Sequence, residues 1–324
     1  PSTPGGLLRR MLSGIFRRKS GSPAGRSEGS AAGRGTAAGP SRAPGPVRPA
    51  PPEPVSLGVS APGSLRPGTD FTARFVAHTE ALRDEVERTL ESLSPTAVHS
   101  LGVKRAQWNV GARITVTLEA QGLRVEDPEQ HFSWSGAMEI LEWDVEVPRD
   151  AEVGTDVTLR YDVFVEGIRV AGLKLRTDVA IAGSPSQPRA KTADTPASSA
   201  FVSFSSDDEL RVSDRVAALR IATTMDVFYS RDSMRSGPWQ PQLEREIAER
   251  DLFLLFWSKS ASDSDYVEWE WKRALELKGV EAFQLHPLQP IELAPPPPEL
   301  ALLQAEDPLM VIRRHDEMKG ESGA

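Results

Sequence analysis

The sequence of 324 residues contains no cysteine. This absence excludes disulfide bonds, a thiolate nucleophile and a cysteine-ligated zinc site. A chain without disulfides suits a reducing compartment, so we expect a cytoplasmic protein. Long apolar runs are also missing: residues 252–257 form one of the longest, whereas a membrane-spanning helix needs roughly 20 apolar residues. The sequence therefore excludes an integral membrane protein.

An excess of basic residues is lacking as well. The formal net charge is -8 and the pI is near 5.3. Nucleic-acid binding needs concentrated Lys and Arg to displace phosphate counterions, so we expect no nucleic-acid partner. The length exceeds that of one typical domain and predicts two folded units joined by linkers.

Residues 1–54 are rich in Pro, Gly, Ala, Ser and Arg and have few large apolar residues. Such a segment cannot offset the entropy of its own ordering, which predicts a disordered basic arm. Within it, residues 7–19 place apolar side chains at helical spacing beside Arg and Lys. This pattern is compatible with peripheral contact to an anionic membrane or a partner. The shortness of the segment and Gly14 favour the simpler interpretation, a solvated arm.

Residues 55–182 change to a period of two, which is typical of half-buried antiparallel strands. The alternation is clearest in residues 114–118, 143–147 and 159–165. Turn signals such as Glu166-Gly167 separate the runs. We expect an all-β, immunoglobulin-like sandwich that serves binding or assembly with an unknown partner. Residues 80–93 have helical spacing and are expected across an edge or end of the sheets.

The histidines of this region do not share a metal-ligand spacing, so we interpret them as surface or packing residues and expect no metal site. They are His78, His99 and His131. Residues 183–198 are small, polar and proline-containing, as in a linker. A second domain over 199–314 and a tail over 315–324 follow.

The second domain alternates strand and helix patterns, which predicts an α/β fold with a parallel sheet covered on both faces. Strands are expected at 200–204, 225–229, 252–257 and 280–285, and helices from 209, around 243–247 and over 267–278. The continuous apolar run at 252–257 predicts a central, buried strand.

Three segments of this domain resemble the Toll/interleukin-1 receptor (TIR) domain of bacteria. They are Phe201-Val202-Ser203-Phe204-Ser205, the strand and loop from Asp226 to Gly237, and Ser264-Asp265-Tyr266-Val267-Glu268-Trp269-Glu270-Trp271. The resemblance implies a flavodoxin-like fold and, for the NAD-cleaving type, hydrolysis of the bond between nicotinamide and ribose. It covers about a third of the chain and does not extend to the predicted sandwich.

Glu270 is the residue that the resemblance singles out as catalytic. A helical projection places it at the margin of a core-facing stripe that includes Val267, Trp271 and Ala274, whereas Glu268 and Glu276 point to solvent. On geometry alone, a rim glutamate in a surface ion pair is the commoner interpretation. The resemblance favours a carboxylate that stabilises positive charge at the anomeric carbon of ribose.

The resemblance also implies a set of NAD-binding residues, with NAD as the substrate and no cofactor or metal. Phe204 and Tyr266 are aromatic side chains that could stack on nicotinamide or belong to the core. The full set is Phe204, Ser205, Ser206, Arg235, Gly237, Trp239, Ser258 and Tyr266. One residue, Pro238, separates Gly237 from Trp239, where the family usually has two. This shortened loop puts phosphate contacts in doubt.

Members of the family commonly complete their sites by self-association, which implies a homo-oligomer assembled through the TIR domain. Gly237 and Trp269 are the expected assembly contacts, because the family uses that loop and the projection puts Trp269 on the solvent side. The sandwich or the tail covering Trp269 is the equal alternative. A signalling or bacterial defence role is implied. A non-catalytic adaptor and a cyclase that forms cyclic ADP-ribose remain the alternative functions.

Overall fold

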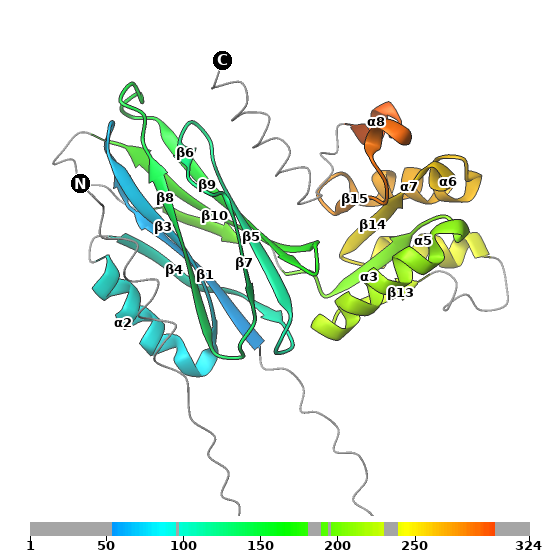
Figure 1. The fold of residues 1–324 in the computed structure, drawn as a ribbon, viewed down its shortest axis with the longest axis horizontal. Helices are drawn as coiled ribbons and strands as arrows, with labels where there is room; N and C mark the ends of the chain where they lie inside the picture. The colour runs from blue at the N-terminus through cyan, green and yellow to red at the C-terminus, as the bar shows by residue number, and fades with distance from the viewer. Residues whose placement is uncertain (1–53, 95–96, 181–188, 194–195, 230–238, 302–324) are drawn as a thin grey trace, which may run out of the picture. The chain divides into compact units, whose positions relative to one another are not determined.

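The computed structural model describes residues 54–94, 97–180, 189–193, 196–229 and 239–301. The predicted arm, including residues 7–19, and the predicted tail at 315–324 lie outside the described residues, apart from residue 54. The described part divides into a β-rich region and an α/β region (Figure 1). None of its helices is long and apolar enough to cross a membrane.

The β-rich region contains two sheets. The first has the strand order β4-β1-β3-β8-β6, and the second has the order β11-β10-β9-β5-β7, with β2 parallel to β10. The strands of the first sheet are β1 (Pro54–Pro62), β3 (Asp70–Thr79), β4 (Ala97–Gln107), β6 (Arg124–Val125) and β8 (Met138–Glu146). Those of the second are β2 (Ser64–Leu65), β5 (Arg113–Ala120), β7 (Glu129–Ser133), β9 (Asp156–Val165), β10 (Ile168–Val179) and β11 (Arg189–Ala193).

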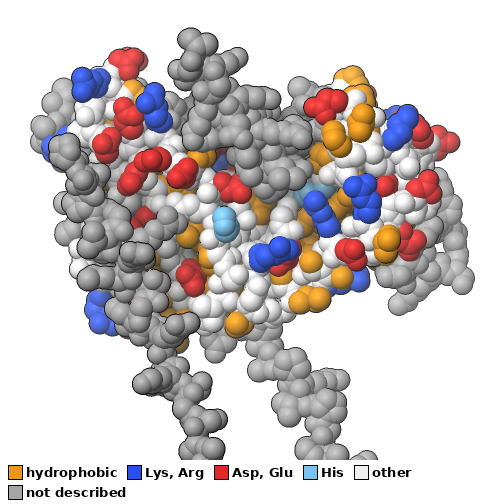
Figure 2. Space-filling model, viewed as in Figure 1, with side chains coloured by type: hydrophobic (Ala, Val, Ile, Leu, Met, Phe, Trp, Pro, Cys, Tyr) orange, Lys and Arg blue, Asp and Glu red, His pale blue; other side chains and the backbone are white. Residues whose placement is uncertain are grey.

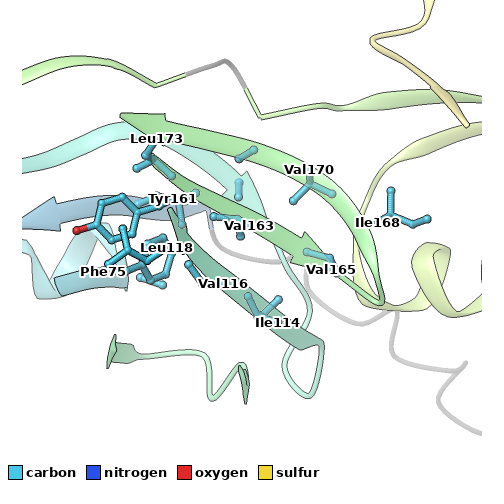
Figure 3. Close-up of a cluster of buried hydrophobic side chains, with 14 of the residues drawn as sticks. Phe75, Ile114, Val116, Leu118, Tyr161, Val163, Val165, Ile168, Val170 and Leu173 are labelled. Atoms are coloured by element: carbon cyan, nitrogen blue, oxygen red, sulfur yellow. The ribbon is translucent and has the colours of Figure 1, made fainter. Parts of the chain in front are cut away.

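The two sheets share one hydrophobic core, built by the period of two that the sequence shows. Ile114, Val116 and Leu118 of β5 are buried, whereas the residues between them are only partly so. Figure 3 shows these side chains beside Tyr161 and Val163 of β9. The two-layered β structure agrees with the predicted alternation, and the immunoglobulin-like connection of its strands stays a prediction.

The hairpin between β9 and β10 turns through Glu166 and Gly167, the step that the sequence marks as a turn. Both residues have positive φ, 50° and 81°, while Val165 pairs with Ile168. This is the pattern of a two-residue turn whose twist matches the strands. Arg113 forms an ion pair with Glu166 at 2.6 Å and so holds the non-glycine residue in the left-handed region.

The predicted helix at 80–93 forms as η1 (Glu80–Leu82) and α2 (Arg83–Leu93). Its expected place at an edge or end of the sheets is wrong, because it packs on a face. Val86 and Leu90 form a small cluster with Val76 of β3, whose chain neighbours Phe75 and Ala77 belong to the core on the other side. The β3 run from 73 to 79 is therefore buried on both faces.

The segment expected as a linker, 183–198, contains strand β11. Residues 189–193 pair antiparallel with β10, with Leu173 opposite Ala193. Backbone pairing does not require apolar side chains, which is why a small, polar composition does not reveal this strand.

The α/β region is built on a parallel sheet of the order β13-β12-β14-β15. Its strands are β12 (Ser199–Ser203), β13 (Asp226–Tyr229), β14 (Leu252–Trp257) and β15 (Phe283–Pro287). Its helices are η2 (Ser206–Asp208), α3 (Glu209–Ala222), α5 (Trp239–Glu249), α6 (Lys259–Ser262), α7 (Asp265–Lys278), η3 (Ile291–Leu293) and α8 (Pro298–Ala301). Numbered within the sheet, this is the order 2-1-3-4 of flavodoxin-like folds.

Helices cover both faces of this sheet, as the sequence pattern predicts. Residues of α5 and α7, such as Leu243 and Val267, pack with Phe201 and Phe253, whereas α3 packs with the alternate strand residues. Strand β14 is interior and wholly buried. The last strand starts later than expected, at Phe283, because Gly279 ends α7 with a φ of 69° and the next residues are exposed.

Charged side chains of both signs are interspersed on the face of the described surface that Figure 2 shows. This face has no broad area of positive charge such as nucleic-acid binding requires.

Candidate active site around Glu270

Strand β12 ends at Ser203, which lies at the carboxyl edge of the parallel sheet. Open parallel sheets bind their ligands beyond this edge, beside the point where the strand order reverses. Strand alternation puts Ser203 on the same face as Phe201, the face that α5 and α7 cover. The side chain of Ser203 is fully buried. The sheet thus presents the Ser203 hydroxyl group to α7 at its carboxyl edge.

Helix α7 begins at a clear cap and ends at a glycine. Ser264 is the N-cap, and its hydroxyl accepts a hydrogen bond from the backbone N–H of Val267. Gly279 follows the last turn with a positive φ that favours glycine. Val267, Glu270, Trp271 and Ala274 are the buried residues of the helix. A carboxyl group therefore occupies a position of the buried stripe.

Glu270 is only 1% exposed. The expectation that its carboxyl group is only partly desolvated, at the margin of the stripe, is therefore wrong, because the side chain is buried. This burial also excludes a surface ion pair at the rim. Ser203 Oγ donates a hydrogen bond to Glu270 Oε2 at 2.6 Å, and Tyr266 forms a second hydrogen bond with the carboxyl group. Glu270 Oε1 is buried and has no hydrogen-bond partner in the described part of the chain.

Burial raises the pKa of Glu270 to about 8, although the hydrogen bonds from Ser203 and Tyr266 oppose this shift. Burial and the nearby Glu270 also raise the pKa of Tyr266, so its hydroxyl remains a donor at neutral pH. A glutamate whose proton affinity is shifted into the neutral range is a typical feature of acid–base or charge-stabilising sites. The acid form predominates in this conformation at neutral pH.

The loops after β12 and β14 are joined next to this site. Ser258, directly after β14, donates its hydroxyl hydrogen to the carboxylate of Asp208 and accepts the N–H of Ala261, which caps α6. Both side chains are nearly fully buried. Ser205 caps η2 in the first loop. These contacts fix the backbone on two sides of the carboxyl edge.

The structure brings some of the predicted NAD-binding residues together and separates others. Tyr266 contacts Glu270, and Ser205 and Ser258 lie at the carboxyl edge, where Ser206 is exposed.

Phe204 is buried and stacked on Tyr229 with ring centroids 4.8 Å apart, which favours the core interpretation. Arg235 and Gly237 lie outside the described residues. Trp239 is the first residue of α5, and its side chain is not described.

Trp269 differs from its expected position on the solvent side. It is partly buried and packs against the cluster of the α/β region that contains Trp271 and Ala274. Neither the sandwich nor the tail is needed to cover that contact. Its role in assembly stays a prediction.

Ser203 and Asp208 are site residues that the sequence-based set missed. Ser203 lies inside the strand motif, and its alternation with Phe201 places it on the α7 side. The signal is therefore a hydroxyl in an apolar strand, at a position where an apolar side chain is the usual choice. Asp208 reads as a helix-capping acid in sequence, and only the fold shows its contact with Ser258.

The fold and the site define a flavodoxin-like α/β domain with a buried carboxyl group beside the carboxyl end of an interior strand. A family model described as "TIR domain" matches residues 200–318. The chain therefore carries a TIR domain.

Two further comparisons add little. The search of curated proteins found no match. Among solved structures, WR4, an MSP family member of C. elegans, is similar over 37% of this chain and 94% of that chain, with 7% identity and a TM-score of 0.21. A similarity at this level supports no conclusion about fold or function.

Proposed function

We propose that the TIR domain cleaves NAD between nicotinamide and ribose and that Glu270 is the catalytic carboxylate. The observation that carries the proposal is the placement of this one carboxyl group, buried at the ligand-binding edge of the sheet and held by two hydroxyl groups. A purely structural position in an apolar stripe would favour an apolar residue, because a buried carboxyl group costs stability.

In the proposed reaction, the bond between the anomeric carbon and the ring nitrogen breaks, and its electron pair stays on nicotinamide, which leaves as a neutral molecule. The ribose becomes oxocarbenium-like, and the Glu270 carboxylate stabilises its positive charge. Water then attacks the anomeric carbon and loses a proton, which gives ADP-ribose. The pyridinium charge of bound NAD favours ionisation of Glu270, since a nearby positive charge lowers a carboxyl pKa.

The unpartnered Oε1 supports this role. A buried acceptor without a hydrogen bond costs about 1–3 kcal/mol, so a substrate hydroxyl that donates to it would bind with a favourable contribution. Ser205 and Ser258 lie at the same edge. Among the residues that the structure describes, they are the candidates for further polar contacts with NAD. The activity is expected to depend on self-association, in a signalling or defence setting.

The test is nicotinamide release by concentrated protein, measured by chromatography with and without a crowding agent. We expect release by the unaltered chain and none by Glu270→Gln, which preserves shape and removes the charge. Glu268→Gln is the matched control, since Glu268 is an exposed residue of the same helix whose carboxylate pairs with Lys272. Full activity of Glu270→Gln would overturn the catalytic assignment.

The same experiment separates the alternatives. Absence of release at every protein concentration, together with self-association in sedimentation, supports a non-catalytic TIR adaptor. The shortened loop at Gly237, Pro238 and Trp239 is the feature that favours this alternative. Chromatography of the second product distinguishes hydrolysis from a cyclase, because cyclic ADP-ribose and ADP-ribose elute separately.

A further inference from the structure

We propose that Ser203 is a positioning residue for Glu270: it holds one carboxyl oxygen so that the other faces the substrate. This inference rests on the proposed NAD cleavage, although its first test does not require that activity. Ser203 itself need not touch NAD, because it acts through its hydrogen bond to the carboxyl group.

The position of the Ser203 hydroxyl is fixed by the sheet. Strand β12 pairs with β13 on one side and with β14 on the other, where Ser203 lies opposite Leu255. Ser203 is the last residue of this interior strand, and the residue before it, Val202, is paired with both neighbouring strands, which leaves Ser203 little freedom to move. The Ser203 hydroxyl therefore keeps its position relative to the carboxyl edge even if α7 shifts.

The two oxygens of Glu270 have different surroundings. Oε2 accepts the Ser203 hydroxyl at 2.6 Å, a short O–H···O hydrogen bond. Oε1 has no partner in the described part of the chain although it is buried. Buried polar atoms are nearly always paired, so an unpaired one calls for an explanation. Rotation of the carboxyl group out of its present plane would move both oxygens, and the bond from Ser203 opposes this rotation.

Tyr266 cannot provide the same constraint. It precedes Glu270 by one helical turn, and its hydroxyl bonds to the carboxyl group from within α7. A shift of α7 would carry Tyr266 and Glu270 together. Among the residues that the structure describes, Ser203 is the one that connects the carboxyl group to a different element, the sheet, and so sets its position relative to a ligand at the sheet edge.

The first test measures the ionisation of Glu270 directly. Protein labelled with ¹³C at the glutamate side-chain carboxyl carbons is titrated by NMR, and Glu270→Gln identifies the resonance. Ser203→Ala removes a donor that favours the charged form, so we expect the pKa of Glu270 to rise by about one unit, a tenfold change in the ratio of acid to carboxylate. Alanine introduces no larger group but leaves Glu270 Oε2 without this donor, so thermal unfolding of the variant first verifies that it is folded.

Ser199→Ala is the matched control. Ser199 is the first residue of the same strand and donates its hydroxyl to the carboxylate of Asp251 at 3.1 Å. The variant therefore loses a serine–carboxylate bond of the same kind at the opposite end of β12. It should leave the Glu270 resonance unchanged. An equal titration of Glu270 in Ser203→Ala and in the unaltered protein would overturn the proposal.

The second test uses the reaction. The part of the kcat/KM profile that rises with pH reports the ionisation of Glu270 in the free enzyme. In Ser203→Ala, this part should therefore move to higher pH by the same amount as the pKa measured by NMR. A uniform loss of active protein would lower the profile without moving it, and that result contradicts the positioning role. If the unaltered chain releases no nicotinamide, the proposed function fails, and the NMR titration alone decides the role of Ser203.

Discussion

Ser258 donates its hydroxyl hydrogen to Asp208 across the carboxyl edge of the parallel sheet, and both side chains are nearly fully buried. The two residues follow different strands, β14 and β12. One hydrogen bond therefore joins the two loops that border Glu270. Because Asp208 is nearly fully buried, water has little access to its carboxyl group and could not easily replace the Ser258 hydroxyl as a donor.

We predict that Ser258→Ala lowers the free energy of unfolding by about 2–3 kcal/mol, because it strips a buried carboxylate of its donor and removes a helix cap. Urea denaturation monitored by tryptophan fluorescence measures the change. Ser213→Ala is the control: this partly exposed serine of α3 donates its hydroxyl to the backbone carbonyl of Leu210 and makes no contact with a carboxylate among the described residues. A loss below about 0.5 kcal/mol, the range of surface substitutions, would contradict the structural role of the Ser258–Asp208 bond.

Glu270 predicts a pH dependence of stability. Its pKa is raised from 4.5 to about 8 in the folded protein, so between these values the folded state binds more protons than the unfolded state. Stability must then fall as pH rises, by about 1.4 kcal/mol per pH unit from this group.

Glu270→Gln removes the titrating group, so its stability curve should lie above that of the unaltered protein at pH 8 and meet it at low pH. Thermal unfolding from pH 5 to pH 8 measures the difference. Parallel curves for the two proteins would show that Glu270 titrates normally in the folded state.

The sequence predicts those parts of the fold that depend on local pattern. Strand β14 follows from six consecutive apolar residues, and α7 ends at Lys278 as expected, although it begins at Asp265, two residues before the expected start. The burial of Glu270 does not, because a helical projection gives the direction of a side chain but not how far β12 and Tyr266 enclose it. The bond from Ser203 joins residues 67 positions apart, and such pairs are set by the topology of the sheet.

Self-association predicts that specific activity rises with protein concentration, because a site shared between copies is complete only in the oligomer. The loop that contains Gly237 lies outside the described residues, and its role comes from the resemblance to TIR domains. We expect Glu270→Ala and a Gly237 variant, each inactive alone, to recover part of the nicotinamide release when mixed. Activity strictly linear in concentration, with no recovery on mixing, would place the whole site within one chain.

Deletion of residues 1–54 should leave the melting temperature of the remaining chain unchanged, because this segment lacks a pattern that could form a core. Differential scanning calorimetry of the two proteins provides the comparison. A large fall in melting temperature would show that the segment packs on a folded domain.

The same two proteins test membrane contact by residues 7–19 in a vesicle sedimentation assay with anionic lipid. Equal binding of both proteins would assign any membrane contact to another part of the chain.

The pairing of β12 along both edges limits how the domain can open. The strand cannot slide without breaking its hydrogen bonds to β13 and β14 at once, and at its other end Asp251 accepts hydrogen bonds from the backbone N–H groups of Ser198 and Ser199. Any motion that admits a dinucleotide to Glu270 must therefore come from α7 or from the loops, while strand β12 stays in place. Amide hydrogens of β12 should accordingly exchange among the slowest in the domain, whether or not the site is open.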